Sequence, residues 1–327
     1  MSTTTTQPDS DRAAYRAALL DLARRDRRIW CLDSDLGGLE KQFQAELPDQ
    51  YADVGIAEAN LMSMAAAVAS TGLLPFANTM AAFASARALE QIKIDIAYHA
   101  LPVRIVATHS GFSAAHLGPT HHAQQDLAVM RSMPNMTVLT PADAGETVRL
   151  VEAVAHLPGP VYVRLGRSPT PAVYPEGTEP EFSVGTAVEL RGGDDVAIVA
   201  AGALPVRFAL EAAAELARCG YAARVLNTHT IKPLDVPAVV AAAERTAGVV
   251  TVEDHSVLGG LGGAVAEALA EHHPAPVRRV GIADAFCPRP GTHAEQLAAA
   301  GVSTAHVVTA ALSLIRTQET RTGRRNP

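Results

Sequence analysis

A single glutamate, Glu58, opens a stretch that carries no further charged residue until Arg87. An acidic side chain at the start of a helix is favoured by the helix dipole, and that explanation requires no function. The alternative is a carboxylate held out of water, where it can serve as a hydrogen-bonding acid or base. Its position alone does not decide between the two, so the neighbouring segments must be considered with it.

Several histidines lie close together in a segment rich in glycine and proline. His109 directly follows the β-branched run 102–108, and His121 and His122 follow a Gly-Pro-Thr turn. In open parallel sheets the ligand crevice lies at the carboxyl ends of the strands. Histidines on one loop at that edge are suited to binding or proton transfer near neutral pH, so we expect a site there.

Alternating helices and strands must position these side chains. In the first half we predict helices at 12–25, 124–132 and 142–155, and strands at 29–32, 102–108, 135–139 and 160–165. Polar residues and Pro75 interrupt the uncharged stretch, which favours two Ala-rich buried helices around a short strand or turn over one membrane helix. Strands that alternate with helices predict a parallel sheet with helices on both faces.

A second run of alternating elements follows the Pro-rich segment 167–180, which we interpret as a linker. We predict strands at 196–201, 223–227 and 248–253, and helices at 205–219, 237–245 and 262–272. The polar end, 316–327, is expected to fray. The fold class is therefore α/β, with two consecutive doubly wound sheet domains at 1–175 and 176–327.

Composition excludes several classes of protein. The chain has 327 residues, of which 48% are hydrophobic and 19% charged, as in globular proteins. A net charge of -7 argues against a nucleic-acid-binding surface. Three cysteines without a CxxC pair argue against a disulfide framework or a Cys-rich zinc site. The first residues lack the basic and apolar regions of a secretory signal, so we expect a cytoplasmic protein.

Several segments, in family order, resemble the transketolases. VGIAEANLMSMAAAVASTGLLPFANTMAAFASARALEQIK, ATHSGFSAAHLGPTHHAQQDLAVMRSMPNMTVLTPAD and VYVRLGRSP are similar to their pyrimidine-binding domain, and VEDHSVLGGLGGAVAEAL to their C-terminal domain. The resemblance covers roughly residues 12–314. It implies thiamine diphosphate as cofactor. It also implies transfer of a two-carbon ketol or acyl unit from a ketose or 2-oxo donor to an aldehyde acceptor, expected to be phosphorylated.

One family motif is missing. Transketolases hold the diphosphate through Mg²⁺ or Ca²⁺ with a GDG motif on a separate domain, and the nearest run here, 192–195, lacks that context. The resemblance therefore implies the C-terminal subunit of a split transketolase, inactive alone and without metal ligands of its own. An N-terminal subunit would carry the diphosphate and metal site, in a two-plus-two assembly. The uncharged helices between residues 59 and 86 would then lie at a subunit interface.

The resemblance also implies roles for individual residues near the cofactor. Glu58 matches the catalytic glutamate that hydrogen-bonds the aminopyrimidine N1′ and so tunes the protonation of the cofactor, which carries the chemistry. Phe83 matches the aromatic residue that stacks on the same ring. Met80, Asp35 and Leu36 are assigned to the rest of the cofactor pocket.

A second group of residues is implied to contact substrate. Arg12, His109 and Arg167 match residues that bind the terminal phosphate, a task for which paired guanidinium donors are suited. His121 matches a histidine beside the reacting carbons, and we expect His109 and His121 to take part in catalysis.

The chain departs from the family at four positions. Leu117 stands in place of an Asp that hydrogen-bonds a donor hydroxyl, and Leu39 in place of a frequent phosphate-binding Ser. Met80 and Ala86 replace aromatic residues near the pyrimidine ring. Because Leu117 gives the substrate pocket an apolar wall, discrimination in favour of hydroxylated donors should fall, and we expect an altered donor.

Three other functions stay open. A β subunit of a 2-oxo acid dehydrogenase shares the two-domain plan, although THSGFSAAHLGPTHH and GRSP fit the transketolase branch better. A pyruvate-using carboligase similar to deoxyxylulose-phosphate synthase is compatible with Leu117. The last is a non-catalytic partner subunit that keeps the fold, against which the presence of Glu58 and Phe83 argues.

Overall fold

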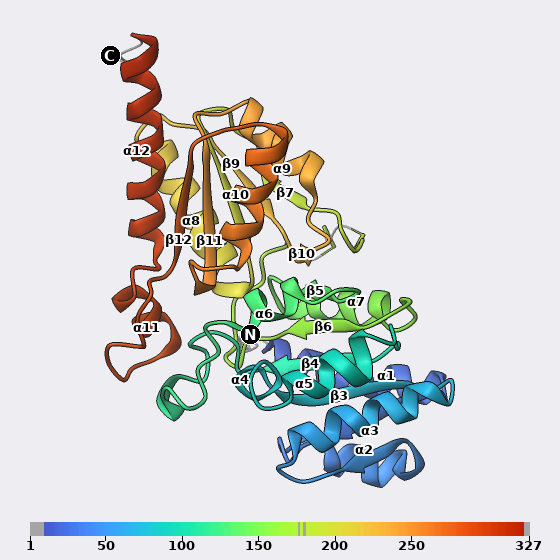
Figure 1. The fold of residues 1–327 in the computed structure, drawn as a ribbon. Helices are drawn as coiled ribbons and strands as arrows, with labels where there is room; N and C mark the ends of the chain where they lie inside the picture. The colour runs from blue at the N-terminus through green and yellow to red at the C-terminus, as the bar shows by residue number, and fades with distance from the viewer. Residues whose placement is uncertain (1–9, 176, 179–180, 324–327) are drawn as a thin grey trace, which may run out of the picture.

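The structure is a computed structural model that describes residues 10–175, 177–178 and 181–323. The first nine residues, part of the expected linker (176 and 179–180) and residues 324–327 of the end expected to fray lie outside the described residues. Figure 1 shows two α/β bodies, one from each half of the chain, that lie one above the other in the view. The predicted α/β class with two sheet domains is confirmed.

The first half builds a sheet whose own strands are all parallel. These are β1 (Ile29–Asp33), β2 (Tyr51–Asp53), β3 (Leu74–Met80), β4 (Arg104–Thr108), β5 (Thr137–Leu139) and β6 (Val161–Arg164). The order across the seven-stranded sheet is β10-β5-β6-β4-β3-β1-β2. Its outermost strand, β10 (Thr230–Lys232), comes from the second half and pairs antiparallel with β5. That edge strand was not predicted, because a three-residue strand has no periodicity to read.

Helices cover both faces of this sheet. They are α1 (Asp11–Arg25), α2 (Glu40–Glu46), η1 (Pro48–Gln50), α3 (Glu58–Ser70), α4 (Ala81–Ala84), α5 (Leu89–Gln91), η2 (Ile92–Ala97), η3 (Ala115–Leu117), α6 (Asp126–Ser132) and α7 (Ala144–Val154). Helix α1 packs against α7 on one face, whereas α3 and η2 share a cluster on the other. The uncharged stretch after Glu58 forms α3, β3 and α4, so the expected pair of helices is present, although α4 is only one turn long.

The second half builds a five-stranded sheet of order β12-β11-β8-β9-β7. Its strands are β7 (Val188–Arg191), β8 (Val196–Ala201), β9 (Ala223–Asn227), β11 (Val249–Ser256) and β12 (Val277–Ile282). Its helices are α8 (Ala203–Arg218), α9 (Val236–Glu244), α10 (Leu261–His272), α11 (His293–Ala299) and α12 (Thr304–Thr322). Only β7 is antiparallel to its neighbour.

Helix α12 corrects one prediction. Residues 316–322 were expected to fray, yet the helix continues to Thr322 and stands along one side of the upper body in Figure 1. The inner face of α12 is buried in the second core through Val307, Ala311 and Leu314. Because this packing holds the helix, it can continue through its polar last turns.

One helical stretch, residues 293–322, is long and apolar enough by length and composition to cross a membrane. It divides into α11 and α12 at a turn where Gly301 has φ of 87°. Helices of water-soluble domains also reach such apolarity, so the stretch is weak evidence for membrane contact.

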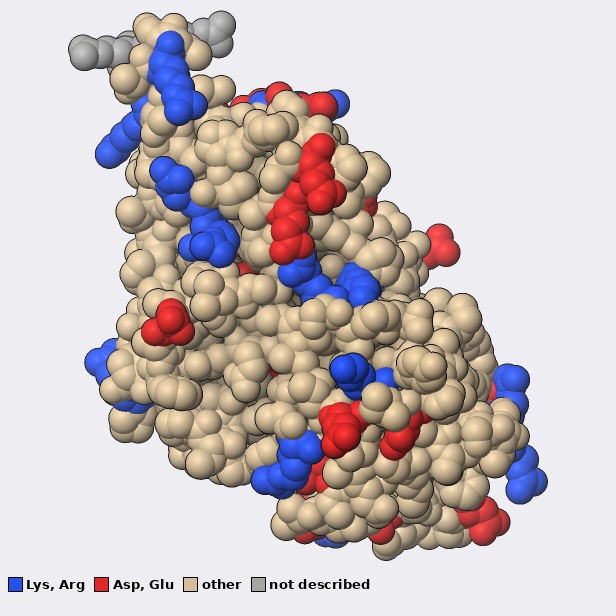
Figure 2. All heavy atoms as spheres, in the orientation of Figure 1, with Lys and Arg blue, Asp and Glu red and all other residues tan. Residues whose placement is uncertain are grey.

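On the face in Figure 2, charged side chains of both signs lie in small separate groups.

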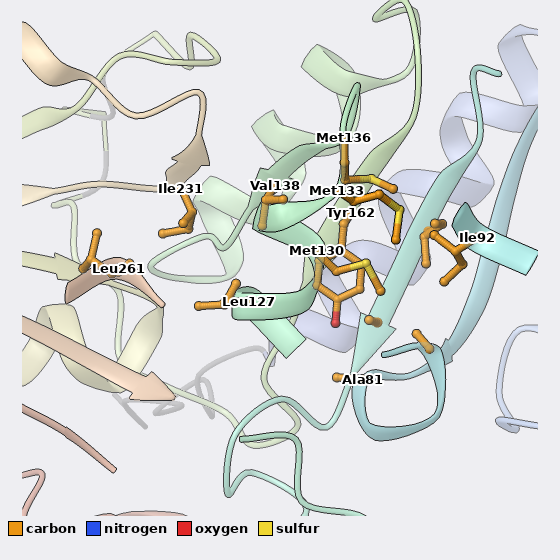
Figure 3. Close-up of a cluster of buried hydrophobic side chains, with 14 of the residues drawn as sticks. Ala81, Ile92, Leu127, Met130, Met133, Met136, Val138, Tyr162, Ile231 and Leu261 are labelled. Atoms are coloured by element: carbon orange, nitrogen blue, oxygen red, sulfur yellow. The ribbon is translucent and has the colours of Figure 1, made fainter. Parts of the chain in front are cut away.

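Hydrophobic clusters join the two halves, and the larger of them includes α6. Leu127 and Met130 of α6 lie in it together with Ile231 and Leu261 from the second half, as Figure 3 shows. Beside it, the buried Arg164 donates to Asp126 at 2.8 Å and to the carbonyl oxygen of Asp254 at 2.7 Å. Because such a cluster and a buried charge network resist separation, the second half fixes the loops at the edge of the first sheet.

Candidate active site

The carboxyl ends of the parallel strands bring the predicted site loops to one edge of the first sheet. The register pairs Asp33 of β1 with Asp53 of β2, and Met80 of β3 with Thr108 of β4. The loops and helix starts that follow these strand ends carry Asp35, Glu58, Phe83 and His109, so residues far apart in sequence become neighbours. This is the edge at which open α/β sheets bind ligands.

Glu58 is a buried carboxylate with one engaged oxygen. It is the first residue of α3 and is 2% exposed, and Arg87 Nη1 donates to its Oε2 at 2.9 Å. Among the described residues, no hydrogen bond reaches Oε1. The loop before it is fixed by Asp53, whose Oδ1 accepts from Gly55 N at 2.8 Å and from Asp35 N at 3.2 Å. A carboxylate oxygen is thus held in place and available to a ligand.

Phe83 and His121 extend this group. The guanidinium carbon of Arg87 lies 4.8 Å from the centre of the Phe83 ring, and the His121 ring meets that ring edge-on at 5.3 Å. Glu58, Arg87, Phe83 and His121 therefore form one continuous chain of contacts. Sequence reasoning missed Arg87, although its place as the first charge after the uncharged stretch, four residues beyond Phe83, was a usable signal.

His109 is neutral at physiological pH. It is 3% exposed, and its pKa is lowered to about 4 by burial first and then by the positive charges of Arg12, Arg167 and Arg16. Its backbone has φ of 59°, a left-handed conformation that non-glycine residues seldom adopt and that often marks functional sites. The strained turn directs this imidazole toward the arginines.

Arg12 and Arg167 come within electrostatic range of each other. The pKa of Arg12 is lowered by burial first and then by the charges of Arg16 and Arg167. Arg167 Nη1 also lies 3.4 Å from Nδ1 of His116. In the described part of the chain, Arg12, Arg16 and Arg167 have no carboxylate within ion-pair distance. Sequence reasoning missed Arg16 and His116, which lie beside these two arginines.

The remaining expected residues take more peripheral positions. Asp35 is exposed, whereas Leu36, Met80 and Leu117 are half-buried, and no hydrogen bond among the described residues joins them to Glu58 or Phe83. Leu36 N donates to Oδ1 of Asp33 at 3.4 Å, which fixes that loop. The structure also locates two positions that depart from the family pattern. Leu39 is buried in the core with Tyr15 and Phe43, and Ala86 is exposed.

The second half anchors the histidine loop. Asp254 of β11 accepts a hydrogen bond from Phe112 N at 3.1 Å and pairs with His293 Nε2 at 2.7 Å. A Cβ added to Gly111, whose φ is 54°, would lie 2.0 Å from the Asp254 carboxylate, so only glycine fits there. The nearby His122 packs on Phe112 at 4.8 Å between ring centres, away from Phe83.

Metal ligands were not expected on this chain. Among the residues that the structure describes, no group of three or more His, Cys, Asp or Glu side chains is arranged to hold a metal ion. The arrangement instead offers a buried carboxylate beside an aromatic ring, and a cationic group a short distance along the same edge. That combination can position a protonated ring nitrogen and bind an anionic substrate terminus.

Asp11, next to Arg12, makes the stability depend on pH. It is 2% exposed, its Oδ2 accepts from Gly166 N at 3.3 Å and its Oδ1 has no hydrogen-bond partner. Burial, with a smaller contribution from Asp143 and Glu146, raises its pKa to about 7. The stability contributed by this group is therefore fully present below its unfolded pKa of 3.8 and is lost as pH rises through about 7.

We expect Asp11→Asn to raise the free energy of unfolding by on the order of 1–4 kcal/mol at pH 8.5 and to change it little near pH 4. Denaturant unfolding at the two pH values measures the difference. Asp21→Asn, which removes an exposed carboxylate of the same helix, is the matched control. An equal gain at both pH values would contradict the prediction.

Each half of the chain matches a protein-family model. Residues 10–172 match the model "Transketolase, pyrimidine binding domain", and residues 185–307 match "Transketolase, C-terminal domain". A 6-deoxy-6-sulfo-D-fructose transketolase subunit of Clostridium sp. (strain MSTE9) is 43% identical over 277 residues, covering 84% of this chain and 85% of that protein. An apulose-4-phosphate transketolase subunit of Phocaeicola vulgatus is 42% identical over 275 residues, covering 84% and 87%.

Solved structures give the same result. One described as a split-gene transketolase, an inactive beta4 tetramer, superposes with a TM-score of 0.86 at 42% identity. The match covers 94% of this chain and 98% of the other. A Campylobacter jejuni transketolase has a TM-score of 0.76 at 23% identity, and this chain spans 48% of its length, which shows a common fold alone.

Proposed function

This chain belongs to the transketolase family as the C-terminal subunit of a split enzyme. From that premise we propose that it forms one wall of a thiamine-diphosphate site and binds the anionic end of a sugar substrate. The observation that carries the proposal is the buried carboxylate of Glu58, whose Oε1 is free. Arg87 contacts both this carboxylate and the Phe83 ring. We place the boundary between its two domains at residues 175–176.

The residues present fit an aminopyrimidine ring. Glu58 offers an acceptor oxygen for a protonated ring nitrogen, and Phe83 offers an aromatic surface for stacking. When bound, thiamine diphosphate supplies a nucleophilic carbon that carries the two-carbon unit between substrates. In the chain itself, Arg87 holds Oε2 of Glu58 and so leaves Oε1 to the cofactor. Met80, Asp35 and Leu36 are proposed to line the rest of this pocket.

The histidines and arginines divide the substrate contacts. We assign to His121, which contacts the Phe83 ring, hydrogen bonds to oxygens at the reacting end of the substrate, and we assign Leu117 to the lining of the same pocket. His109 is uncharged and can accept a proton from a substrate hydroxyl or hydrogen-bond it. Arg12 and Arg167 supply guanidinium donors to an anionic terminus, whose charge would relieve the repulsion between them.

A partner subunit is part of the proposal. The relative from Phocaeicola vulgatus is named as one subunit of its transketolase, and the solved split-gene neighbour, an assembly of beta chains alone, is described as inactive. We propose that this chain likewise needs an N-terminal subunit, which carries the diphosphate and Mg²⁺ or Ca²⁺ ligands, in a two-plus-two assembly. Ile56, Ile94 and Tyr98, which are 74%, 48% and 78% exposed beside or on α3 and η2, support an interface there.

The substrate is proposed to be a sugar with a charged end. The two curated relatives carry the names of a sulfonated fructose and of apulose 4-phosphate, both with an anionic terminus. The arginines around His109 support the same class here. A cytoplasmic location is kept as part of the proposal, supported by three cysteines that are all free thiols.

We expect Leu117→Asp to shift the donor preference. The carboxylate would restore an acceptor for a donor hydroxyl, so kcat/KM for xylulose 5-phosphate relative to pyruvate should rise by about tenfold or more, since one such hydrogen bond contributes about 1.5–3 kcal/mol. Ketol and acyl transfer by the assembled enzyme measure the ratio. Leu117→Asn is the uncharged control, and an unchanged ratio in both variants would contradict the role of Leu117.

A ketol-transfer assay tests the proposed function. The chain is purified with the polypeptide encoded next to it, supplied with thiamine diphosphate and Mg²⁺, and given ketose donors and aldehyde acceptors with and without a phosphate. We expect turnover with charged acceptors. Lipoyl-domain acylation without ketol transfer would instead assign a 2-oxo acid dehydrogenase. Pyruvate as the preferred donor would assign a carboligase, for which 1-deoxy-D-xylulose-5-phosphate synthases at 36–38% identity are a precedent.

A further inference from the structure

Two arginines of α1 lie one turn apart on the same side of the helix. Arg12 and Arg16 are separated by four residues, both are half-buried, and neither is ion-paired within the described residues. Like charges at this spacing destabilise a helix. When such a pair is partly buried, an anion that binds between or beside the two guanidinium groups offsets their repulsion and stabilises the protein.

Arg16 reaches a loop of the candidate active site. Its Nη2 donates to the carbonyl oxygen of Gly37, in the loop that follows β1. Gly38 has φ of 102°, which disfavours a side chain, and a Cβ at this position would meet the guanidinium group of Arg16, which would have to move. The loop is therefore shaped around the Arg16 side chain.

By resemblance to the family, the same loop also lacks a serine donor. Leu39 occupies the position at which transketolases often have a phosphate-binding serine, and its side chain is 2% exposed in the core with Tyr15 and Phe43. It cannot line the substrate pocket. Arg16 therefore places a guanidinium donor at this loop, whereas Leu39 of the loop lies in the core and offers no donor to the site.

The charged groups around Arg16 are of both signs. Asp33, at the end of β1, acts together with Arg16 on Tyr15 and Cys31. The other charges act on the side of His109. Arg12 and Arg167 are charged, and Arg16 also acts on His109, which is uncharged near pH 7. The nearest acidic group of α1, Asp11, is buried, with Gly166 N as its hydrogen-bond donor. Three guanidinium groups around a neutral imidazole are suited to a doubly charged ligand.

We propose that Arg16 is a third anion-binding residue of this site and makes it select a substrate that ends in a phosphate monoester over one that ends in a sulfonate. The inference rests on the proposed function, because the anion is the terminus of the donor or the acceptor sugar. A phosphate monoester carries close to two negative charges at pH 7, whereas a sulfonate carries one. The third guanidinium therefore adds more to phosphate binding than to sulfonate binding.

The test compares three acceptors in the assembled enzyme. D-glyceraldehyde 3-phosphate, its sulfonate analogue 2-hydroxy-3-oxopropane-1-sulfonate and uncharged D-glyceraldehyde have the same carbon chain and differ in terminal charge. For Arg16→Gln we expect the ratio of kcat/KM for the phosphate over the uncharged acceptor to fall about 10–100-fold. The sulfonate ratio should fall less, and Arg16→Lys should restore most of the phosphate ratio.

A purely structural role predicts a different result. If Arg16 only supports the loop through Gly37, Arg16→Gln lowers kcat/KM for all three acceptors together and leaves the ratios unchanged, which overturns the proposal. Arg24→Gln, on the same helix and paired with Glu46, is the matched control and should alter no ratio. An equal fall of the phosphate and sulfonate ratios would overturn the selectivity for phosphate.

A binding measurement separates this inference from the proposed function. Inorganic phosphate should raise the unfolding temperature of the wild-type complex, and Arg16→Gln should lose most of that rise while Arg24→Gln keeps it. If the wild-type complex transfers no ketol unit, the proposed function fails, and the phosphate response still decides whether Arg16 binds an anion. If the wild-type complex transfers ketol units but Arg16→Gln leaves the acceptor ratios and the phosphate response unchanged, the proposed role of Arg16 is refuted and the proposed function stands.

Discussion

Replacing Glu58 by alanine should lower kcat of the assembled enzyme by about 10²–10⁴-fold, the range typical of a removed acid or base. The carboxylate is 2% exposed and its free Oε1 is the acceptor that we assign to the ring nitrogen of the cofactor. Without it the aminopyrimidine loses the group that sets its protonation. Single-turnover ketol transfer, measured at saturating thiamine diphosphate, separates this loss from weaker cofactor binding.

Two further variants keep this test decisive. Glu58→Gln preserves the size of the side chain and should still lower the rate by at least 10²-fold, because an amide cannot exchange the proton. Glu244→Ala removes an exposed carboxylate of α9 and should leave the rate unchanged. Near-normal activity of Glu58→Ala in a folded complex would exclude Glu58 from the chemistry.

The isolated chain should show no measurable ketol transfer, and addition of the N-terminal subunit should restore it. The reason is that the ligands for the diphosphate and its metal are assigned to the partner, while Glu58 and Phe83 lie on this chain. Calorimetric titration of thiamine diphosphate with Mg²⁺ into the chain, the partner and the complex is the measurement. We expect tight binding to the complex alone.

Interface variants provide the matching control. Tyr98→Asp places a charge on an aromatic residue of the proposed interface that is 78% exposed in the single chain, and should abolish both assembly and activity. Val148→Asp alters an exposed residue of α7, on the opposite face of the sheet, and should affect neither. Robust turnover or tight cofactor binding by this chain alone would contradict the split-site proposal.

Long periodic segments were predicted well from the sequence. Strands β8 and β9 have the predicted bounds, and α1, α8 and α10 begin and end within two residues of them, because a buried face imposes a regular apolar pattern. Short edge strands were missed. The strands β2, β7, β10 and β12 are half-exposed or only three residues long, so their existence depends on a neighbouring strand rather than on their own pattern.

The sequence by itself determined the family, the α/β class and the residue types available to the site, since motifs such as those around Glu58, Phe83 and His121 are local. Only the tertiary structure decided how they meet. Strand order and the Met80–Thr108 register bring together loops separated along the chain, and these pairings leave no local signal. For the same reason, only the fold showed that Leu39 lies in the core and that Arg16 of α1 contacts the loop after β1.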